Sequence, residues 1–183
     1  MVVITTIPQS VPHGETQSVW IVNPLTKPRV LNASGYPARI PRPREDLYEI
    51  KSTPDMGEGV FAKRDIMRGE IIFSERPLLV LPELQPSSQG STLLEFYKAQ
   101  QKKQSGFEKL LEAAIAHLPP ESQADFRALH NAHPPDQCGP LVGILRTNNY
   151  DLRNLFDGSD TSANYKVVNK IGCRINHRCV FSI

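Results

Sequence analysis

The sequence predicts an α+β fold in which short antiparallel strands come first, helices are inserted, and strands return. The first indication is residues 47–52, where Tyr48 and Ile50 alternate with charged side chains, as in a strand with one buried face. The second is a pair of helix-start signatures that begin at Thr92 and Ser105. The third is the return of β-branched residues after residue 134. Because strands and helices are segregated along the chain, the alternating α/β class is disfavoured.

The composition is that of one domain of ordinary size. The chain has 183 residues, of which 39% are hydrophobic, and this is enough to build a core. A formal net charge of +2 predicts neither direct nucleic-acid binding nor an acidic membrane partner. Three cysteines fit a reducing compartment better than a disulfide framework. Since the chain shows no signal peptide and no apolar run near the roughly 20 residues that span a bilayer, we expect a soluble intracellular protein, nuclear or cytoplasmic.

Residues 1–44 are predicted to form an extended, Pro-rich and partly basic N-terminal tail. Seven of the 16 prolines lie between Pro8 and Pro43, and the stretch shows neither helical nor strand periodicity. The basic side chains of its second half, with no acidic residue between them, are Lys27, Arg29, Arg39, Arg42 and Arg44. They indicate either a solvated linker or a docking or nuclear-address segment.

Residues 45–183 are predicted to form the folded domain, in three parts. In residues 45–90 the segments 47–52, 59–63 and 70–74 predict an antiparallel meander. Residues 91–140 form a helical insertion, and Pro120 is expected to begin its third helix, which runs through Phe126 and Leu129. The second helix carries an apolar stripe of Phe107, Leu110, Leu111, Ala114, Ile115 and Leu118. In residues 141–183 mixed strand and turn are expected, with Val142, Ile144, Leu145, Tyr165, Val167 and Val168 as buried positions.

Chemistry is indicated by short motifs at the two ends of this domain. Gly57-Glu58-Gly59 lies in a turn between two predicted strands and, taken alone, is ordinary turn chemistry. The series Gly57–Ala62, Ile66–Ile72 and Glu75-Arg76-Pro77, however, resembles the opening of a SET domain. Arg174–Cys179 is similar to that family's second signature, although Arg178 stands where the family has serine, and Gly143–Asn149 is similar to the stretch after its helical insertion. The resemblance covers residues 46–179 and is strongest to fungal SET and SET-and-MYND proteins.

The resemblance implies a protein-lysine methyltransferase fold, in which small curled sheets surround S-adenosylmethionine and a substrate lysine, possibly of a histone, enters from the opposite side. It implies that backbone at Glu58, Gly59, Val60 and Phe61 borders the methionine end of the cofactor. Asn176 and His177 would contact its amino and adenine groups, and Arg174 would brace their loop. All of these roles require the turn at Gly59 and the loop at His177 to lie side by side.

A metal site is not expected. Cys173, His177, Cys179 and Cys138 contain the right ligand types, but their spacing matches no standard zinc motif. We therefore interpret the three cysteines as small buried residues.

The family pattern stops at Cys179, before the proline-asparagine step, strand and catalytic tyrosine that the resemblance would require. Val180–Ile183 match none of these, so no catalytic residue is assigned and the C-terminal part of the domain is expected to be incomplete. Two interpretations follow. The chain is a fragment of a methyltransferase that is inactive alone, or it is a catalytically inactive SET-like interaction module, for which the stripe from Phe107 to Leu118 would be the contact surface.

Overall fold

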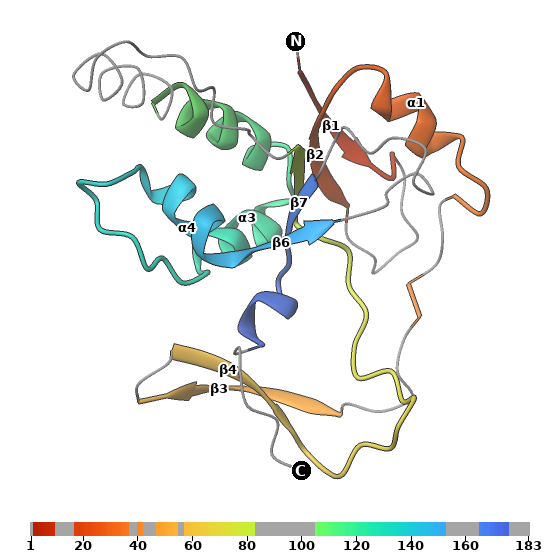
Figure 1. The fold of residues 1–183 in the computed structure, drawn as a ribbon, viewed down its shortest axis with the longest axis vertical. Coiled ribbons are helices and arrows are strands. Elements are labelled where there is room, and N and C mark those ends of the chain that lie inside the picture. Colours follow the sequence, from red (N-terminus) through yellow and green to blue (C-terminus); the bar gives the residue numbers. More distant parts are fainter. Residues whose placement is uncertain are drawn as a thin grey trace.

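The main element of the computed structural model is a five-stranded sheet in the order β1-β2-β5-β7-β6 (Figure 1). The model describes residues 2–9, 17–36, 40–41, 47–54, 57–82, 105–152 and 165–175. The strands of the sheet are β1 (Val3–Ile7), β2 (Ser18–Val22), β5 (Leu79–Pro82), β6 (Asn149–Leu152) and β7 (Tyr165–Val168). β2 and β5 are parallel and the other pairs are antiparallel. A second sheet is the antiparallel hairpin of β3 (Tyr48–Thr53) and β4 (Gly57–Ala62).

Both faces of the five-stranded sheet are covered, and each face has its own core. Successive residues of β2 point to opposite faces, so Ile21 packs in one hydrophobic cluster while Trp20 packs in the other. The larger cluster joins the sheet to the helices on one side, and the smaller one lies on the side of α1 (Thr26–Leu31) (Figure 1). In the smaller cluster the Tyr165 hydroxyl lies 3.1 Å from the Thr26 hydroxyl, which satisfies both groups.

Three helices on one face of the sheet contribute to the larger cluster. They are residues 105–115, α3 (Pro120–Arg127) and α4 (Pro140–Asn148). The predicted apolar stripe is confirmed, because Leu111, Ala114, Ile115 and Leu118 are buried and Phe107 and Leu110 pack against the same cluster. The predicted helix start at Pro120 is also confirmed, but the helix ends at Arg127, before Leu129; Phe126 and Leu129 are both buried. The α+β class with small sheets therefore stands.

The expectation of an extended tail over residues 1–44 is wrong where the structure describes it. β1 and β2 belong to the main sheet, α1 follows them, and Val19 and Val22 are fully buried. The apolar run of β2 shows no alternation because the strand is buried on both faces, and a strand of this kind has no period-2 signal.

Two expectations about local structure also need correction. Residues 70–74 form no strand, and Ile71 is 49% exposed; within the described ranges no strand pairs with this segment. Val142, Ile144 and Leu145 are buried as predicted, yet they lie in helix α4 and not in strand and turn. The helix start predicted at Thr92 lies outside the described residues.

Residues 105–115 are helical as predicted, although the start of this helix lies outside the described residues, and Glu108 does not form the predicted capping box with Ser105. Its two carboxylate oxygens instead accept the Leu141 and Val142 amides, at 2.8 and 2.9 Å, and so cap the N-terminus of α4. The contact with α4 thus determines the role of Glu108, which the sequence pattern had assigned to the start of its own helix.

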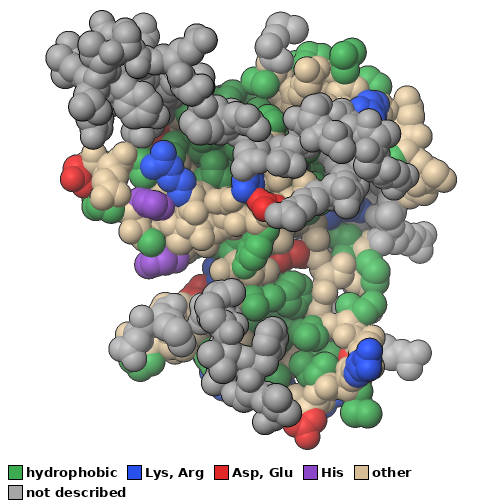
Figure 2. All heavy atoms as spheres, in the orientation of Figure 1, with side chains coloured by type: hydrophobic (Ala, Val, Ile, Leu, Met, Phe, Trp, Pro, Cys, Tyr) green, Lys and Arg blue, Asp and Glu red, His purple; other side chains and the backbone are tan. Residues whose placement is uncertain are grey.

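The β3–β4 hairpin extends away from the main sheet, and η1 (Gly172–Arg174) lies between the two (Figure 1). Hydrophobic side chains are visible over this lower part of the molecule in Figure 2. Ile50 is 38% exposed and Phe61 is 40% exposed, so the hairpin buries little apolar surface of its own. A two-stranded hairpin is marginally stable alone, and its contacts with η1 therefore matter for its placement.

Candidate functional site

The first part of the candidate site is strand β4, which carries the Gly57-Glu58-Gly59 motif. Gly57 has a φ of 66°, a left-handed conformation that favours glycine, and the Thr53 hydroxyl donates to its carbonyl at 2.9 Å. Gly59 is the buried residue of β4 and pairs with Lys51 of β3. Glu58 on one side of it is exposed, and Val60 on the other is half-buried. The motif therefore presents a backbone edge with a carboxylate beside it.

The second part is the short 3-10 helix η1, which follows β7 and packs against β4. The carboxylate of Glu75 accepts the backbone N–H groups of Lys170, Ile171 and Gly172, at distances of 2.6–3.0 Å. Hydrogen bonds from several amides to one charged group are stronger than neutral ones. This turn is thus held from the segment that joins β4 to β5.

Arg174 connects the two parts of the site. Its Nε donates to the Glu58 carboxylate at 2.6 Å, and its Nη1 donates to the Lys170 carbonyl. The Arg174 side chain is only 13% exposed, whereas that of Glu58 is 48% exposed. One guanidinium therefore braces its own loop and joins it to β4, across 116 positions in the sequence.

Two further side chains attach η1 to the main sheet. The Tyr150 hydroxyl donates to the Gly172 carbonyl at 2.9 Å, and the Cys173 thiol donates to the Asn148 carbonyl at 3.0 Å. Burial raises the pKa of Cys173 to about 11, so the thiol stays protonated at neutral pH and keeps its role as a donor. Burial also raises the pKa of Tyr150, with smaller contributions from Cys173 and Glu75. η1 is accordingly fixed on two sides.

The structure brings some of the predicted site residues together and does not describe the others. Glu58, Gly59, Val60 and Phe61 lie along β4, and Arg174 reaches this strand from η1. Asn176 and His177 lie outside the described residues. Gly59 lies in strand β4 and not in a turn, and its expected proximity to the His177 loop stays a prediction; η1, which directly precedes Ile175, packs against β4.

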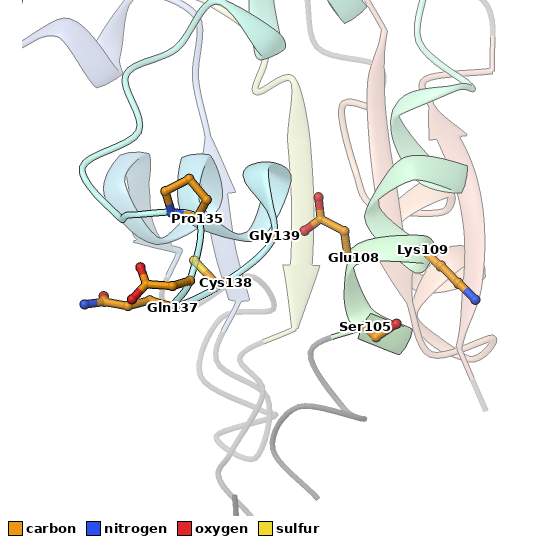
Figure 3. Close-up of a pocket in the computed structure, with 8 residues that line it drawn as sticks. Ser105, Glu108, Lys109, Pro135, Gln137, Cys138 and Gly139 are labelled. Carbon is orange, nitrogen blue, oxygen red and sulfur yellow. The ribbon is translucent and has the colours of Figure 1, made fainter. Parts of the chain in front are cut away.

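A pocket of about 410 Å³ lies elsewhere, between the helix of residues 105–115 and the loop before α4 (Figure 3). It is lined by Ser105, Glu108, Lys109, Pro135, Asp136, Gln137, Cys138 and Gly139. None of these belongs to β4 or η1, and both carboxylate oxygens of Glu108 are already bonded to α4. This pocket is thus not part of the predicted site.

Cys138 is buried, as predicted for a small core residue, and Cys173 is half-buried; Cys179 is outside the described residues. Within the described ranges, no three His, Cys, Asp or Glu side chains lie close enough together to hold a metal ion. The helices in those ranges also include none that combines the length and apolar character needed to cross a bilayer.

Sequence reasoning missed the anchors of the loop. Glu75 was noted only as part of a family motif, and Tyr150 was assigned no role. Their partners are 95–97 and 22 positions away, respectively, and neither helical nor strand periodicity reports contacts of that kind. The available signal was a carboxylate three residues before the apolar run that begins at Leu78, a pattern too common to be diagnostic.

The chain is similar to a curated protein of known class. It is 26% identical, over 134 residues, to the histone-lysine N-methyltransferase set5 of Schizosaccharomyces pombe. The match covers 73% of this chain and 32% of that protein, so the chain spans about a third of the length of this relative. No family model matches the chain, and no solved structure matches it. The similarity suggests the SET family.

Proposed function

We propose that this chain carries the cofactor-binding part of a SET-type, S-adenosylmethionine-dependent protein-lysine N-methyltransferase. The observation that carries the proposal is the Glu58–Arg174 ion pair. It joins β4, which resembles the opening motif of the family, to the first residue of the stretch that resembles its second signature. The proposed fold requires these two motifs to lie side by side, and the similarity to a histone-lysine methyltransferase supports the same class.

The side chains at this contact suit the methionine end of the cofactor. That end is a zwitterion, with one ammonium and one carboxylate group. Glu58 can accept hydrogen bonds from an ammonium group, and Arg174 can donate to a carboxylate. Phe61, three residues further along the same strand, is 40% exposed, but its side chain lies on the opposite face of β4 from that of Glu58. The donor set therefore fits the group that the family would bind.

The residues of this chain would act by positioning. When bound, S-adenosylmethionine supplies the methyl group on a sulfonium, and the transfer is an in-line displacement that needs alignment more than covalent help. We propose that the backbone of Glu58–Phe61 borders the methionine end, and that Asn176 and His177 contact the amino and adenine groups. Arg174 holds the loop that carries them. An apolar channel would keep the substrate lysine neutral, because burial lowers the pKa of an ammonium group.

The substrate would be a lysine side chain of another protein, and a histone is the first candidate because the relative is a histone-lysine methyltransferase. A nuclear or cytoplasmic location follows from that substrate class. The resemblance assigns the catalytic tyrosine to a stretch without a match among these 183 residues. We therefore propose that this polypeptide binds the cofactor and does not itself transfer methyl groups.

The test is titration calorimetry with S-adenosylmethionine and with S-adenosylhomocysteine. We expect a dissociation constant in the micromolar range, or about −8 kcal/mol, for the 183-residue chain. Gly59→Asp should abolish binding, because it places a side chain and a negative charge at the buried position of β4. Gly106→Asp is the matched control, since a Cβ at Gly106 meets no atom within 4 Å. No heat with folded wild-type protein would contradict the proposal and favour an interaction module without cofactor.

Incubation with radiolabelled S-adenosylmethionine and histones tests the second half of the proposal. Incorporation by the 183-residue chain above that of Gly59→Asp would show that these residues suffice for catalysis, and the catalytic group would then have to be sought among them.

A further inference from the structure

Glu75 occupies an unusual position for a carboxylate on the segment between β4 and β5. Its Oε1 accepts the Gly172 amide at 2.6 Å and the Ile171 amide at 3.0 Å, and its Oε2 accepts the Ile171 and Lys170 amides at 2.9 and 3.0 Å. Three successive backbone N–H groups that converge on one point form an anion-binding concavity. The chain fills this concavity with its own side chain.

The close approach depends on the absence of a side chain at Gly172. A Cβ at that position would lie 3.3 Å from the Glu75 Oε1 and 3.1 Å from the Asn169 side-chain nitrogen. Those distances are tighter than ordinary van der Waals contact, so an alanine there would require the Asn169 side chain and the Glu75 carboxylate to shift by a few tenths of an ångström. Gly172 and Glu75 are therefore in close contact, although 97 positions separate them in the sequence.

The turn that Glu75 holds is the one from which Arg174 projects. Arg174 bonds the Lys170 carbonyl with its side chain and the Ile171 carbonyl with its amide, the latter at 2.9 Å. Both acceptors belong to residues whose amides bind Glu75. The direction of the Arg174 side chain toward Glu58 is therefore set by the turn, and the turn is set by the carboxylate.

We infer that Glu75 is a positioning residue for ligand binding. Its carboxylate fixes residues 170–172 so that Arg174 is presented to β4 and to the amino-acid end of a bound nucleoside. The ligand side of this inference rests on the proposed function. Glutamine cannot replace the glutamate, because its amide nitrogen is itself a donor and would face the backbone N–H groups.

The first experiment measures amide hydrogen exchange by NMR in the 183-residue chain and in Glu75→Gln. We expect exchange at residues 170–172 to accelerate by about tenfold or more, the scale of a lost charge-assisted hydrogen bond. Glu108→Gln is the matched control, because Glu108 also receives two backbone amides but does so at the start of α4. It should leave residues 170–172 unchanged. Unaltered exchange in Glu75→Gln, or equal acceleration in the control, would overturn the inference.

The second experiment separates positioning from a merely structural role. S-adenosylhomocysteine carries the amino-acid end, whereas methylthioadenosine lacks it. We expect Glu75→Gln to weaken the first ligand by about tenfold and to leave the second within twofold. Equal losses for both, or no loss for either, would contradict positioning. If the wild-type chain binds neither, the proposed function fails, while the exchange measurement still decides what Glu75 does to the turn.

Gly172→Ala provides a second variant in case Glu75→Gln does not fold. This variant retains the charge of Glu75 but shifts its carboxylate. The amides of residues 170–172 should therefore exchange faster, and the affinity for S-adenosylhomocysteine should fall while that for methylthioadenosine does not. Unchanged exchange in Gly172→Ala would refute the dependence on close approach.

Discussion

The Glu58–Arg174 ion pair should be measurably coupled, and the structure allows its strength to be compared with that of a control pair. Two unit charges about 4 Å apart attract by about 1 kcal/mol in water and about 4 kcal/mol at an effective dielectric constant near 20. Arg174 is largely shielded, but Glu58 is half-exposed and is screened by water. We therefore expect a coupling free energy near the lower bound, about 1 kcal/mol.

The assay is a double-mutant cycle of Glu58→Ala and Arg174→Met, with the free energy of unfolding measured in urea. The cycle removes the separate contribution of the bond from Arg174 to the Lys170 carbonyl, because that bond is lost in both arms that carry the Arg174 change. Since the charges are partly exposed, the coupling should decrease as salt is added.

The control is the Glu112–Arg127 pair, which has the same separation of 2.6 Å but side chains that are 58% and 45% exposed. Glu112→Ala with Arg127→Met should give a coupling below about 0.5 kcal/mol. If the Glu58–Arg174 coupling is no larger than this, the pair does not hold η1 to β4, and the reasoning from burial is refuted.

Three other outcomes are expected. Phe126→Ala should lower the free energy of unfolding by about 3–5 kcal/mol, because the ring is fully buried; a loss below 1 kcal/mol in urea denaturation would contradict this core. Gly139→Ala should cost about 1–2 kcal/mol, because its Cβ would lie 2.4 Å from the Glu108 carboxyl carbon, and the cost should vanish in a Glu108→Ala background. Cys173 should be alkylated at pH 8 about 100-fold more slowly in the folded than in the urea-unfolded chain, by site-resolved mass spectrometry. Equal alkylation rates in the two states would refute burial of the thiol. The pKa of Cys173 is about 11 in the folded chain and 9.0 in the unfolded chain. The contribution of Cys173 to the free energy of unfolding should therefore be constant below pH 9 and decrease between pH 9 and 11.

The parts of the fold that the sequence predicts well are those with one buried and one exposed face. The stripe on residues 105–118 shows a clear period of 3.6 residues because water lies on one side of it. The alternation in β3 predicted that strand correctly, although Ile50, on the face expected to be buried, is 38% exposed. β2 and β5 lie between two cores and are apolar throughout, so the period that identifies a strand is missing. Residues 70–74 show the opposite error, because strand-forming side chains cannot make a strand without a neighbour.

The candidate site was predictable only as far as its motifs. The resemblance singled out Glu58 and Arg174, and the structure shows these two residues in contact. No local sequence pattern predicts the contact of Glu75 with residues 170–172. The Glu75 carboxylate meets these backbone amides because of the path of the whole chain. The residue types at position 75 and at positions 170–172 do not by themselves indicate the contact. The roles of Asn176 and His177 remain predictions from the resemblance.

The parallel pairing of β2 with β5 has a consequence for how the protein can be divided. The entire β3–β4 hairpin is an excursion between two neighbouring strands of one sheet, since Val19 pairs with Leu79 and its amide bonds the Leu78 carbonyl at 3.0 Å. A polypeptide begun at residue 45 would keep every motif of the site and yet leave β5 with a bare hydrogen-bonding edge. Such an edge invites strands from other molecules, so a shortened version would be prone to aggregate and would misrepresent the intact chain.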